Sequence, residues 1–318
     1  MKDNTPTAVA SRSFSKHPVL RAELLEKYSN VRFNDEGLSL SGKALIDFAK
    51  GRQKIITALE KIDEEFLVAS PELKVIAKYG VGHDMIDKQA MIKYGICLGW
   101  KGGVNKRSVS EMALSFMISL LHLIPQTNHE IRNGTWKNRK GKCLSNRIVG
   151  IIGCGNIGKD LTVLLQPFEC KILVNDILDF PDFYSKYGLE PVGLEELLKS
   201  ADIVTLHVPL DSSTRNMMNR DRLKLLNSET ILLNLARGGL VDEEALKQML
   251  KNGGLAAAGF DVFTTEPPVD QELLNLPNFL STPHIGGSSE EAILAMGRAA
   301  IEGLDNNRIP SDDYPLGG

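Results

Sequence analysis

Short apolar runs alternate with stretches of helical periodicity over the first hundred residues. The apolar runs have the length of strands and occur in "TAVASRSF" (7–14), "VRFN" (31–34), "KIITAL" (54–59), "KVIAKYG" (74–80) and "ICLGW" (96–100). Between them, apolar residues recur every three or four positions in "HPVLRAELLEKY" (17–28), "SGKALIDFAKG" (41–51) and "MIDKQAMIKYG" (85–95), as they do in amphipathic helices. This alternation predicts a small parallel α/β domain assembled from βαβ units.

A longer apolar segment follows in "SVSEMALSFMISLLHLIP" (108–125), which we expect to be one helix ended by Pro125. Its apolar residues cover more than one side of that helix, and such a helix is buried on several sides. It is therefore a core helix, or a helix that crosses between domains or lies in a subunit interface. The two alternatives are compatible.

The second half of the chain opens with a glycine-rich turn between an apolar strand and a helix. "RIVGII" (147–152) leads into G-x-G-x-x-G at Gly153, Gly155 and Gly158, and the helix continues to Pro167. In such a turn the first glycine permits the tight bend, the second lets the backbone approach a pyrophosphate, and the third lets helix and strand pack closely. The unpaired N–H groups at the helix N-terminus would face the phosphates. Taken alone, the motif is also compatible with a glycine turn that binds nothing.

An acidic residue ends the next apolar strand. Asp176 follows "KILVN" (171–175), roughly 20 residues beyond the glycine turn, where a carboxylate can accept hydrogen bonds from ribose hydroxyls. The order strand, turn, helix, strand and acid predicts a Rossmann dinucleotide site. Ile177 and Leu178 come next, so no adjacent Arg or Lys is available to bind a 2′-phosphate. The sequence therefore predicts NAD rather than NADP.

Polar residues stand at the ends of three later strands. "TILLNLAR" (230–237) ends at Arg237, "LAAAGFDVF" (255–263) contains Asp261 and precedes Glu266, and "NFLSTP" (278–283) precedes His284. Ligands of open α/β sheets bind beyond the carboxyl ends of the strands. A guanidinium matches a substrate carboxylate, an imidazole suits proton transfer near neutral pH, and a nearby carboxylate favours the charged imidazole. Each residue alone could equally be structural, as a strand cap or a packed turn residue, but the coincidence of all three favours an active site.

Six motifs together resemble one family. "KYGVGHDMID", "SVSEMALSFM", "GCGNIG", "NLARGGLVDEEAL", "GFDVFTTEPP" and "TPHIGGSSEEA" look like signatures of the NAD-dependent D-isomer-specific 2-hydroxyacid dehydrogenases, which include D-lactate, glycerate and D-3-phosphoglycerate dehydrogenases. The resemblance extends from about Lys74 to about Ala299. It implies an α/β fold of two domains, in which a Rossmann nucleotide-binding domain (105–287) is inserted into a flavodoxin-like parallel α/β substrate domain (1–104 and 288–318).

The resemblance also implies the chemistry and the residues that perform it. Arg237, Glu266 and His284 would be the catalytic residues of hydride transfer between NAD(H) and a D-2-hydroxyacid or 2-oxoacid. His284 would exchange a proton with the substrate oxygen, Glu266 would favour the charged imidazole, and Arg237 would bind the carboxylate. The implied cofactor-binding residues are Gly153, Gly155, Asn156, Ile157, Gly158, Asp176, His207, Val208, Pro209, Thr214, Ala236, Arg237, Asp261, His284 and Gly286.

For the substrate, the resemblance implies contacts from Lys78, Tyr79, Gly80, Val81, Gly82 and Arg237, with the N–H groups of the "YGVG" loop on the carboxylate. It further implies a homodimer formed through the nucleotide-binding domain. Two segments depart from the family pattern: Lys78 stands where many members have Arg, and Trp100, Lys101 and Gly102 replace an "N-x-P" segment. Because of these departures the sequence does not identify the substrate, for which D-3-phosphoglycerate is one candidate. They do not change the expected class of reaction.

Basic residues near the predicted substrate site suggest a second anionic group on the substrate, with phosphate as the leading candidate. They are Lys78, Lys101, Lys106, Arg107 and Arg12. A solvated basic surface is the alternative. The chain ends at "NNRIPSDDYPLGG", so we expect no fused regulatory domain.

Composition narrows the remaining classes. The net charge of -3, with 24% charged and 42% hydrophobic residues, disfavours nucleic acid or an anionic membrane as the main partner. The four cysteines show no CxxC spacing, which predicts free thiols and no metal site. Neither a signal peptide nor an apolar run of about 18 residues is found, so we expect no membrane span and a cytoplasmic location. An NAD(H)-sensing, corepressor-like interaction protein on the same scaffold is the alternative function.

Overall fold

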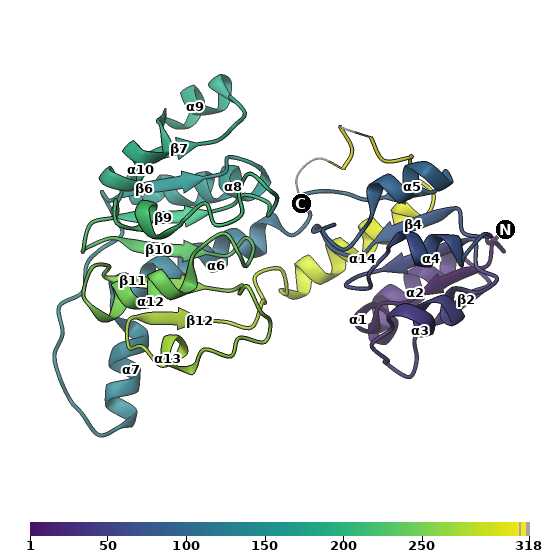
Figure 1. Cartoon of the computed structure of the whole chain (residues 1–318), viewed down its shortest axis with the longest axis horizontal. Helices are drawn as coiled ribbons and strands as arrows, with labels where there is room; N and C mark the ends of the chain where they lie inside the picture. Colours follow the sequence, from purple (N-terminus) through teal and green to yellow (C-terminus); the bar gives the residue numbers. More distant parts are fainter. Residues whose placement is uncertain (312, 316–318) are drawn as a thin grey trace. The chain divides into compact units, whose positions relative to one another are not determined.

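The computed structural model describes residues 1–311 and 313–315 and divides into two compact units. The first unit contains Met1–Asn105 and takes up the chain again from Glu290, and the second is Lys106–Ser289. Figure 1 labels many of the elements of both. The chain thus leaves the first unit once and returns to it through a single helix.

The first unit is built on a five-stranded parallel sheet in the order β2-β1-β3-β4-β5. Its strands are β1 (Thr7–Val9), β2 (Val31–Phe33), β3 (Lys54–Thr57), β4 (Val75–Lys78) and β5 (Cys97–Gly99). In register, Val9 of β1 pairs with Phe33 of β2 and Ile56 of β3. The order 2-1-3-4-5 is that of flavodoxin-like folds, so the predicted fold of this unit is confirmed.

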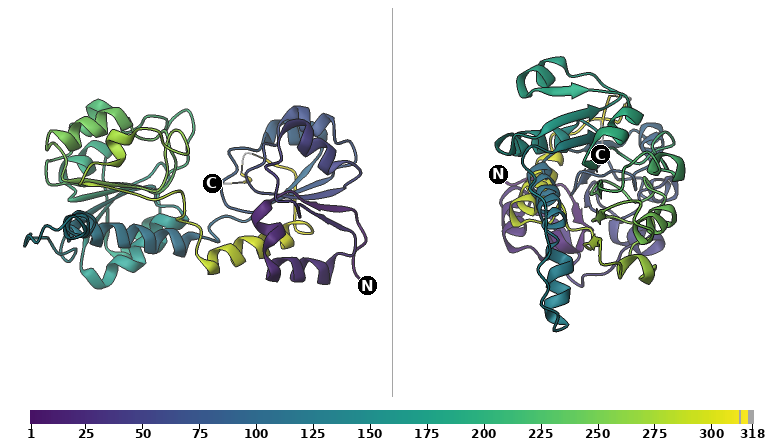
Figure 2. Two further views of the ribbon diagram at one scale, coloured as in Figure 1. Left: turned by 90° about the horizontal axis from the view of Figure 1, so that it is seen from below. Right: turned by 90° about the vertical axis from the view of Figure 1, so that its left-hand side faces the viewer.

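Helices cover both faces of this sheet (Figure 2, left view). One face packs against α3 (Gly42–Ala49), α4 (Glu64–Val68) and α5 (Lys88–Tyr94), and the other against α1 (Arg12–Lys16), α2 (Pro18–Lys27) and α14 (Glu290–Gly303). The returning helix α14 fits closely because a Cβ on its Gly297 would lie 2.3 Å from the Leu20 side chain. A Cβ on Gly99 of β5 would likewise lie 2.1 Å from the carbonyl oxygen of Gly303.

One predicted strand is too long. The apolar run 7–14 forms a strand only as far as Val9, and Arg12–Lys16 is helical. Ser11 is the cause, because its Oγ accepts a hydrogen bond from the N–H of Phe14 and so caps the helix. The other predicted strands and helices of this unit lie where the sequence pattern places them, to within a few residues.

The second unit is built on a seven-stranded parallel sheet in the order β12-β11-β10-β9-β6-β7-β8. Its strands are β6 (Ile148–Ile152), β7 (Lys171–Asn175), β8 (Leu189–Pro191), β9 (Ile203–Leu206), β10 (Ile231–Asn234), β11 (Ala257–Phe260) and β12 (Phe279–Ser281). Numbered within the unit, this is the Rossmann order 3-2-1-4-5-6 with a seventh strand added. The order reverses between β6 and β9, which marks the position where such sheets bind dinucleotides.

The helices of the second unit also form two layers (Figures 1 and 2). One core contains residues of α6 (Lys106–Leu121), α8 (Asn156–Leu165) and α9 (Pro181–Tyr187), and the other contains residues of α10 (Leu194–Ser200), α11 (Arg220–Leu223), α12 (Glu243–Lys251) and α13 (Gln271–Leu274). A 3-10 turn, Gln166–Phe168, ends α8 at the expected proline. Helix α6 buries seven residues in this unit, which confirms the core-helix alternative.

The long apolar segment is not one helix. Helix α6 ends at Leu121, and α7 (Ile124–Arg132) begins after Leu123, whose backbone has φ +57°. Pro125 lies in the first turn of α7, where the missing N–H costs no hydrogen bond, so the expectation that it ends the helix is wrong. Among the described residues, no single helix meets the length and hydropathy of a membrane span. Only α6 and α7 taken together do, bent by 61°.

Candidate active site

The glycine turn lies between β6 and α8 in a conformation that its glycines make possible. Gly153 has φ +100°, and a Cβ there would lie 2.5 Å from the carbonyl oxygen of His207. A Cβ on Gly158 would lie 2.2 Å from the oxygen of Gly153, whereas a Cβ on Gly155 would meet no atom within 4 Å. The first and third glycines therefore permit close packing inside the protein, and the second leaves open space over the turn. This is the division of roles expected in a pyrophosphate-binding turn.

The start of α8 has no side-chain cap. Gly155 is the N-cap and carries no side chain, and Asn156 and Ile157 begin the ten-residue helix. The first N–H groups of a helix have no intrahelical acceptor and attract anions. The residues present therefore fit a bound pyrophosphate.

Asp176 is held beside this turn at the end of β7. Its Oδ2 accepts the N–H of Cys154 at 2.5 Å, and its Oδ1 accepts the N–H of Leu178 at 2.8 Å. Ile177 is fully exposed and Leu178 is mostly exposed, so the two residues that follow the carboxylate present only apolar side chains. The position suits a ribose hydroxyl and would place a 2′-phosphate beside a negative charge.

The segment after β9 forms one wall of the same sheet edge. Burial lowers the pKa of His207 to about 4, so this imidazole is neutral at physiological pH. Its Nε2 lies 3.0 Å from Oγ1 of the buried Thr205. Thr214 donates to the carbonyl oxygen of Pro209 at 2.7 Å and so closes the loop, with Val208 against Gly153. These predicted cofactor residues therefore lie together at the end of β9.

An imidazole–carboxylate pair lies at the ends of β11 and β12. Nδ1 of His284 lies 2.8 Å from Oε2 of Glu266, and Oε1 of Glu266 accepts the N–H of Phe263 at 3.0 Å. Both carboxylate oxygens of Glu266 are thus engaged. The pair leaves Nε2 of His284 for a ligand, and the His284 side chain is 51% exposed.

Arg237 lies at the end of β10, the strand next to β11. Asn234 orders the turn after β10, because its side chain donates to the carbonyl oxygen of Arg237 at 2.8 Å and accepts the N–H of Ala236 at 3.2 Å. The Arg237 guanidinium donates to the carbonyl oxygen of Ala236 at 2.7 Å. Because β10, β11 and β12 are parallel neighbours, the arginine and the imidazole–carboxylate pair share one edge of the sheet.

Asp261 has a role that the sequence did not indicate. Its fully buried carboxylate accepts three hydrogen bonds from the turn that carries His284: the hydroxyl of Thr282 at 2.5 Å, and the N–H groups of Ile285 at 2.8 Å and Gly286 at 2.7 Å. His284 itself has φ +56°, an uncommon backbone conformation for a residue with a side chain. Asp261 therefore holds the turn that carries His284 in a conformation that is unfavourable without such support.

Sequence reasoning missed Ser108, which fastens this turn to α6. Its hydroxyl donates to the carbonyl oxygen of Gly286 at 2.6 Å and accepts the N–H of Ser289 at 3.4 Å. Gly286 is thereby held from both sides, since its N–H is bonded to Asp261. No local pattern could have revealed this contact, because 178 residues separate Ser108 from Gly286.

The predicted substrate loop lies at the end of β4 in the first unit. Lys78 is buried, and its ammonium donates to the carbonyl oxygens of Ala58 at 2.6 Å and Tyr79 at 3.2 Å. Gly80 has φ +122°, so the loop requires glycine there. Trp100, one of the departures from the family pattern, donates through Nε1 to the carbonyl oxygen of Val81 at 2.8 Å. Lys78 and Trp100 thus support the Tyr79–Gly82 loop from two sides.

Two of the other four predicted basic residues form ion pairs. Lys101 lies 3.4 Å from Glu302, and Arg107 lies 3.1 Å from Asp160. Lys106 is the first residue of α6 in the second unit. Arg12 differs from these, because it lines a hollow at the carboxyl ends of β1 and β3.

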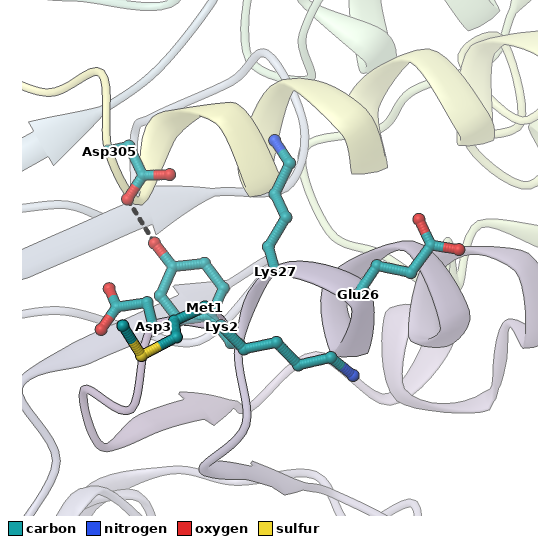
Figure 3. A pocket seen from close by; sticks show the side chains of 7 residues that line it. Met1, Lys2, Asp3, Glu26, Lys27 and Asp305 are labelled. Carbon is teal, nitrogen blue, oxygen red and sulfur yellow. Dashed lines mark hydrogen bonds between the residues drawn. The ribbon is translucent and has the colours of Figure 1, made fainter.

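A second hollow, of about 570 Å³, lies at the opposite edge of the same sheet (Figure 3). There Tyr28 donates to Asp305 at the end of α14, and Lys54 donates to Tyr28 at 2.9 Å and to Asp305 at 3.0 Å. Burial and the Asp305 carboxylate raise the pKa of Tyr28 to about 12, so the phenol stays protonated. These bonds attach the returning helix to the sheet, and the hollow lies at the amino ends of the strands, away from the edge where ligands bind.

Two further expectations concern cysteines and metals. All four cysteines are free, as predicted, and burial raises the pKa of Cys154 in the glycine turn to about 11. Among residues 1–311 and 313–315, no group of three or more His, Cys, Asp or Glu side chains is arranged to hold a metal ion.

The second unit combines a Rossmann sheet and its glycine turn with an arginine and an imidazole–carboxylate pair at the ends of neighbouring strands. This combination is typical of a dinucleotide-dependent oxidoreductase. Residues 114–286 match the model of the D-isomer specific 2-hydroxyacid dehydrogenase NAD binding domain. The chain belongs to the D-isomer specific 2-hydroxyacid dehydrogenase family and is an NAD-dependent enzyme. This confirms the resemblance read from the motifs and favours the dehydrogenase over the corepressor-like alternative.

Relatives of known activity agree with this assignment. The chain is 32% identical over 308 residues to the glyoxylate reductase of Thermococcus onnurineus, covering 93% of this chain and 92% of that one. It is 36% identical over 253 residues to the hydroxypyruvate reductase of Thermotoga maritima, covering 78% and 82%. Among solved structures, the TT0316 protein of Thermus thermophilus superimposes with a TM-score of 0.83 at 30% identity over 95% of both chains.

Proposed function

We propose that the chain reduces small 2-oxo acids to D-2-hydroxy acids with NADH, with glyoxylate and hydroxypyruvate as the first substrates to test. The observation that carries this proposal is the His284–Glu266 pair, 2.8 Å apart, beside the end of the strand that carries Arg237. The names of the relatives support the choice of test substrates. In the cell the same site can run in the oxidation direction, for which D-3-phosphoglycerate is a further candidate.

His284 is the proton donor in this proposal. When bound, NADH supplies the hydride for the carbonyl carbon. Glu266 faces Nδ1 of His284, so Nε2 is the atom that gives a proton to the substrate oxygen. Glu266 stabilises the imidazolium, which must form again after each turnover. Its second oxygen is fixed by Phe263, so the carboxylate holds the orientation of the ring as well as its charge.

Arg237 binds the substrate carboxylate in this proposal. A guanidinium presents N–H groups in a planar fork that matches two carboxylate oxygens, and its charge polarises the neighbouring carbonyl. Tyr79, Gly80, Val81 and Gly82 of the first unit remain predicted substrate ligands through their backbone N–H groups. Lys78 stabilises the conformation of that loop, because its ammonium donates hydrogen bonds to the carbonyl oxygens of Ala58 and Tyr79.

The function is tested by following the absorbance of NADH during its oxidation with a panel of 2-oxo acids. The panel should contain glyoxylate, hydroxypyruvate, pyruvate, oxaloacetate and 3-phosphohydroxypyruvate. We expect measurable turnover of at least one of them, and chiral analysis should find the D product. A chain that binds NADH but turns over none of the panel would contradict the proposed substrate class.

Cofactor preference is expected to depend on Asp176. The wild-type chain should use NADH with a kcat/KM at least about tenfold above that for NADPH, because a 2′-phosphate would meet the carboxylate that now accepts two backbone N–H groups. Asp176→Ala should bring the kcat/KM values for NADH and NADPH closer together, mainly by lowering the value for NADH. Asp182→Ala, which removes an equally negative side chain farther along the same unit, is the control. Equal use of both cofactors by the wild type would refute this role.

Replacing Glu266 with Gln should lower kcat for reduction by about tenfold. One carboxylate oxygen of Glu266 faces Nδ1 of His284, and the other accepts the N–H of Phe263. An amide has a single oxygen, so it cannot keep both contacts in their present form, and the imidazole loses part of what orients it and favours its charged form. Steady-state kinetics with the best 2-oxo acid would measure the effect, and an unchanged kcat would remove Glu266 from the role.

We further propose that the first unit is the substrate domain and that two chains associate through the second. The second unit presents exposed apolar side chains at Ile124, Ile131 and Trp136, in α7 and just after it, which support a homodimer contact there. Sedimentation equilibrium giving the mass of one chain would rule the dimer out. The four free cysteines support a reducing compartment such as the cytoplasm, which fractionation of the source cells would test.

A further inference from the structure

A hollow of about 420 Å³ lies at the carboxyl ends of β1 and β3 in the first unit. The residues that line it include, after β1, Ser11, Arg12, Ser13 and Lys16 and, after β3, Ala58 and Glu60. Since β1, β3 and β4 are parallel neighbours, this edge of the sheet also carries the Tyr79–Gly82 loop. Open α/β sheets bind their ligands at this edge.

The hollow adjoins the loop predicted to hold the substrate carboxylate. The side chain of Tyr79 lies near Ser13 and packs edge-on against Phe14, with ring centroids 5.5 Å apart. On the other side, Lys78 donates to the carbonyl oxygen of Ala58. One wall residue from each strand is therefore in direct contact with the start of the loop.

Two cations line the hollow from one side. Arg12 and Lys16 are four residues apart in α1 and so lie on the same face of that helix. In the part of the chain that the structure describes, neither takes part in an ion pair. The ammonium of Lys16 lies over Gly37, where a Cβ would be only 2.6 Å from Nζ. Gly37, with φ +68°, therefore provides both the turn and the room for this lysine.

The wall behind these cations is rigid. The buried side chain of Asn34 donates to the carbonyl oxygens of Ala10 at 2.8 Å and Leu38 at 2.9 Å, and it accepts the N–H of Leu38 at 3.0 Å. Its backbone N–H donates to Ser15 at 3.0 Å, and Ser15 donates to the carbonyl oxygen of Val9 at 3.1 Å. These hydrogen bonds fix the loop from Asn34 to Leu38, over which Lys16 lies, to the end of β1 without the help of a ligand.

Glu60 is the one acidic residue among those that line the hollow, and it is already engaged. Its carboxylate accepts the N–H of Ala58 at 2.6 Å. Two cations against this single carboxylate leave the hollow with an excess of positive charge. Lys78, which the sequence suggested as the selecting cation, is instead bonded to backbone carbonyl oxygens.

We propose that this hollow binds a second anionic group, a phosphate or a carboxylate, at the far end of the 2-oxo acid, and that Arg12 and Lys16 are its ligands. The proposal rests on the proposed function, in which the Tyr79–Gly82 loop holds the C1 carboxylate. It replaces Lys78 with Arg12 and Lys16 as the residues that select the substrate.

The kinetic test compares substrates that differ only in the distal group or its charge. The pairs are 3-phosphohydroxypyruvate with hydroxypyruvate, and oxaloacetate with pyruvate. In the wild type, kcat/KM should be higher for the substrate with the second anionic group in at least one pair. The pair that shows this difference tells whether the hollow prefers a phosphate or a carboxylate. In the double variant Arg12→Gln, Lys16→Gln the ratio should fall at least about tenfold. Lys43→Gln, Lys50→Gln makes the same change of charge on exposed residues of the same unit and should leave the ratio unchanged.

A binding measurement separates failure of this proposal from failure of the proposed function. Isothermal titration of 3-phosphoglycerate, D-glycerate, D-malate and D-lactate into the full chain requires no turnover. In one pair, the wild type should bind the acid that carries the second anionic group more tightly, and the Arg12→Gln, Lys16→Gln variant should lose that difference. If the wild type shows the difference but reduces no 2-oxo acid, the proposed function fails alone. If the second anionic group is favoured in neither pair, or if the variant keeps the same ratios in both measurements, the hollow is not an anion site.

Discussion

Replacing His284 with Ala is expected to lower kcat for 2-oxo acid reduction by about 10²–10⁴-fold, the usual contribution of a general acid. Nε2 of His284 is the proposed proton donor, because Nδ1 faces Glu266 at 2.8 Å. The KM for NADH should change little, since the glycine turn and Asp176 lie at β6 and β7. Steady-state kinetics at saturating NADH would measure the effect.

His129→Ala is the matched control, because that histidine is exposed on α7 and its ring faces Asn133. It should retain wild-type kcat. The His284 variant should also unfold at nearly the wild-type temperature, since its side chain is about half exposed. A kcat within twofold of wild type would mean that another group delivers the proton.

Asp261→Asn is expected to lower kcat by about 100-fold, because a displacement of about 1 Å in a reacting group costs that much. The carboxylate now accepts hydrogen bonds from Thr282, Ile285 and Gly286. An amide can accept those of Thr282 and Ile285, but its NH₂ group would then face the N–H of Gly286. The turn that carries His284 at φ +56° would lose one of its supports. The unmade hydrogen bond should also lower the free energy of unfolding by about 1–3 kcal/mol.

The kinetic pattern distinguishes this role of Asp261 from the contact with the cofactor that the family resemblance implies. A positioning residue lowers kcat while leaving the Kd for NADH, measured by fluorescence titration, near its wild-type value. A direct cofactor contact would raise that Kd and spare kcat at saturation. Asp242→Asn is the control, because Asp242 also accepts a backbone N–H, from Ala245 at 2.9 Å, but caps α12 instead of supporting the turn that carries His284. An amide oxygen can accept that single N–H as well, so this variant should keep both its stability and its kcat.

Those features of the fold that depend on neighbouring residues could be predicted from the sequence. The apolar runs place the strands, and the glycine spacing places the Rossmann turn, because both follow from local backbone geometry. Where local chemistry was overlooked, the prediction was wrong: Ser11 caps a helix inside an apolar run, and Leu123 breaks the long helix before Pro125. The strand ends also placed Arg237, Glu266 and His284 at one edge, since parallel strands in one sheet point the same way.

The sequence by itself thus determined the two sheets and the glycine turn between β6 and α8, and it proposed Arg237, Glu266 and His284 as the reacting side chains. Only the tertiary structure decided which residues hold those side chains in place and which basic residues line an open hollow. The Asp261 carboxylate meets its donors 21 to 25 residues later, and Ser108 meets Gly286 across 178 residues. Lys78 and Arg12 look alike in sequence, yet Lys78 is buried against carbonyl oxygens while Arg12 lines an open hollow. The physical reason is that burial and hydrogen-bond partners are set by segments far apart in the chain, which no local pattern of residues encodes.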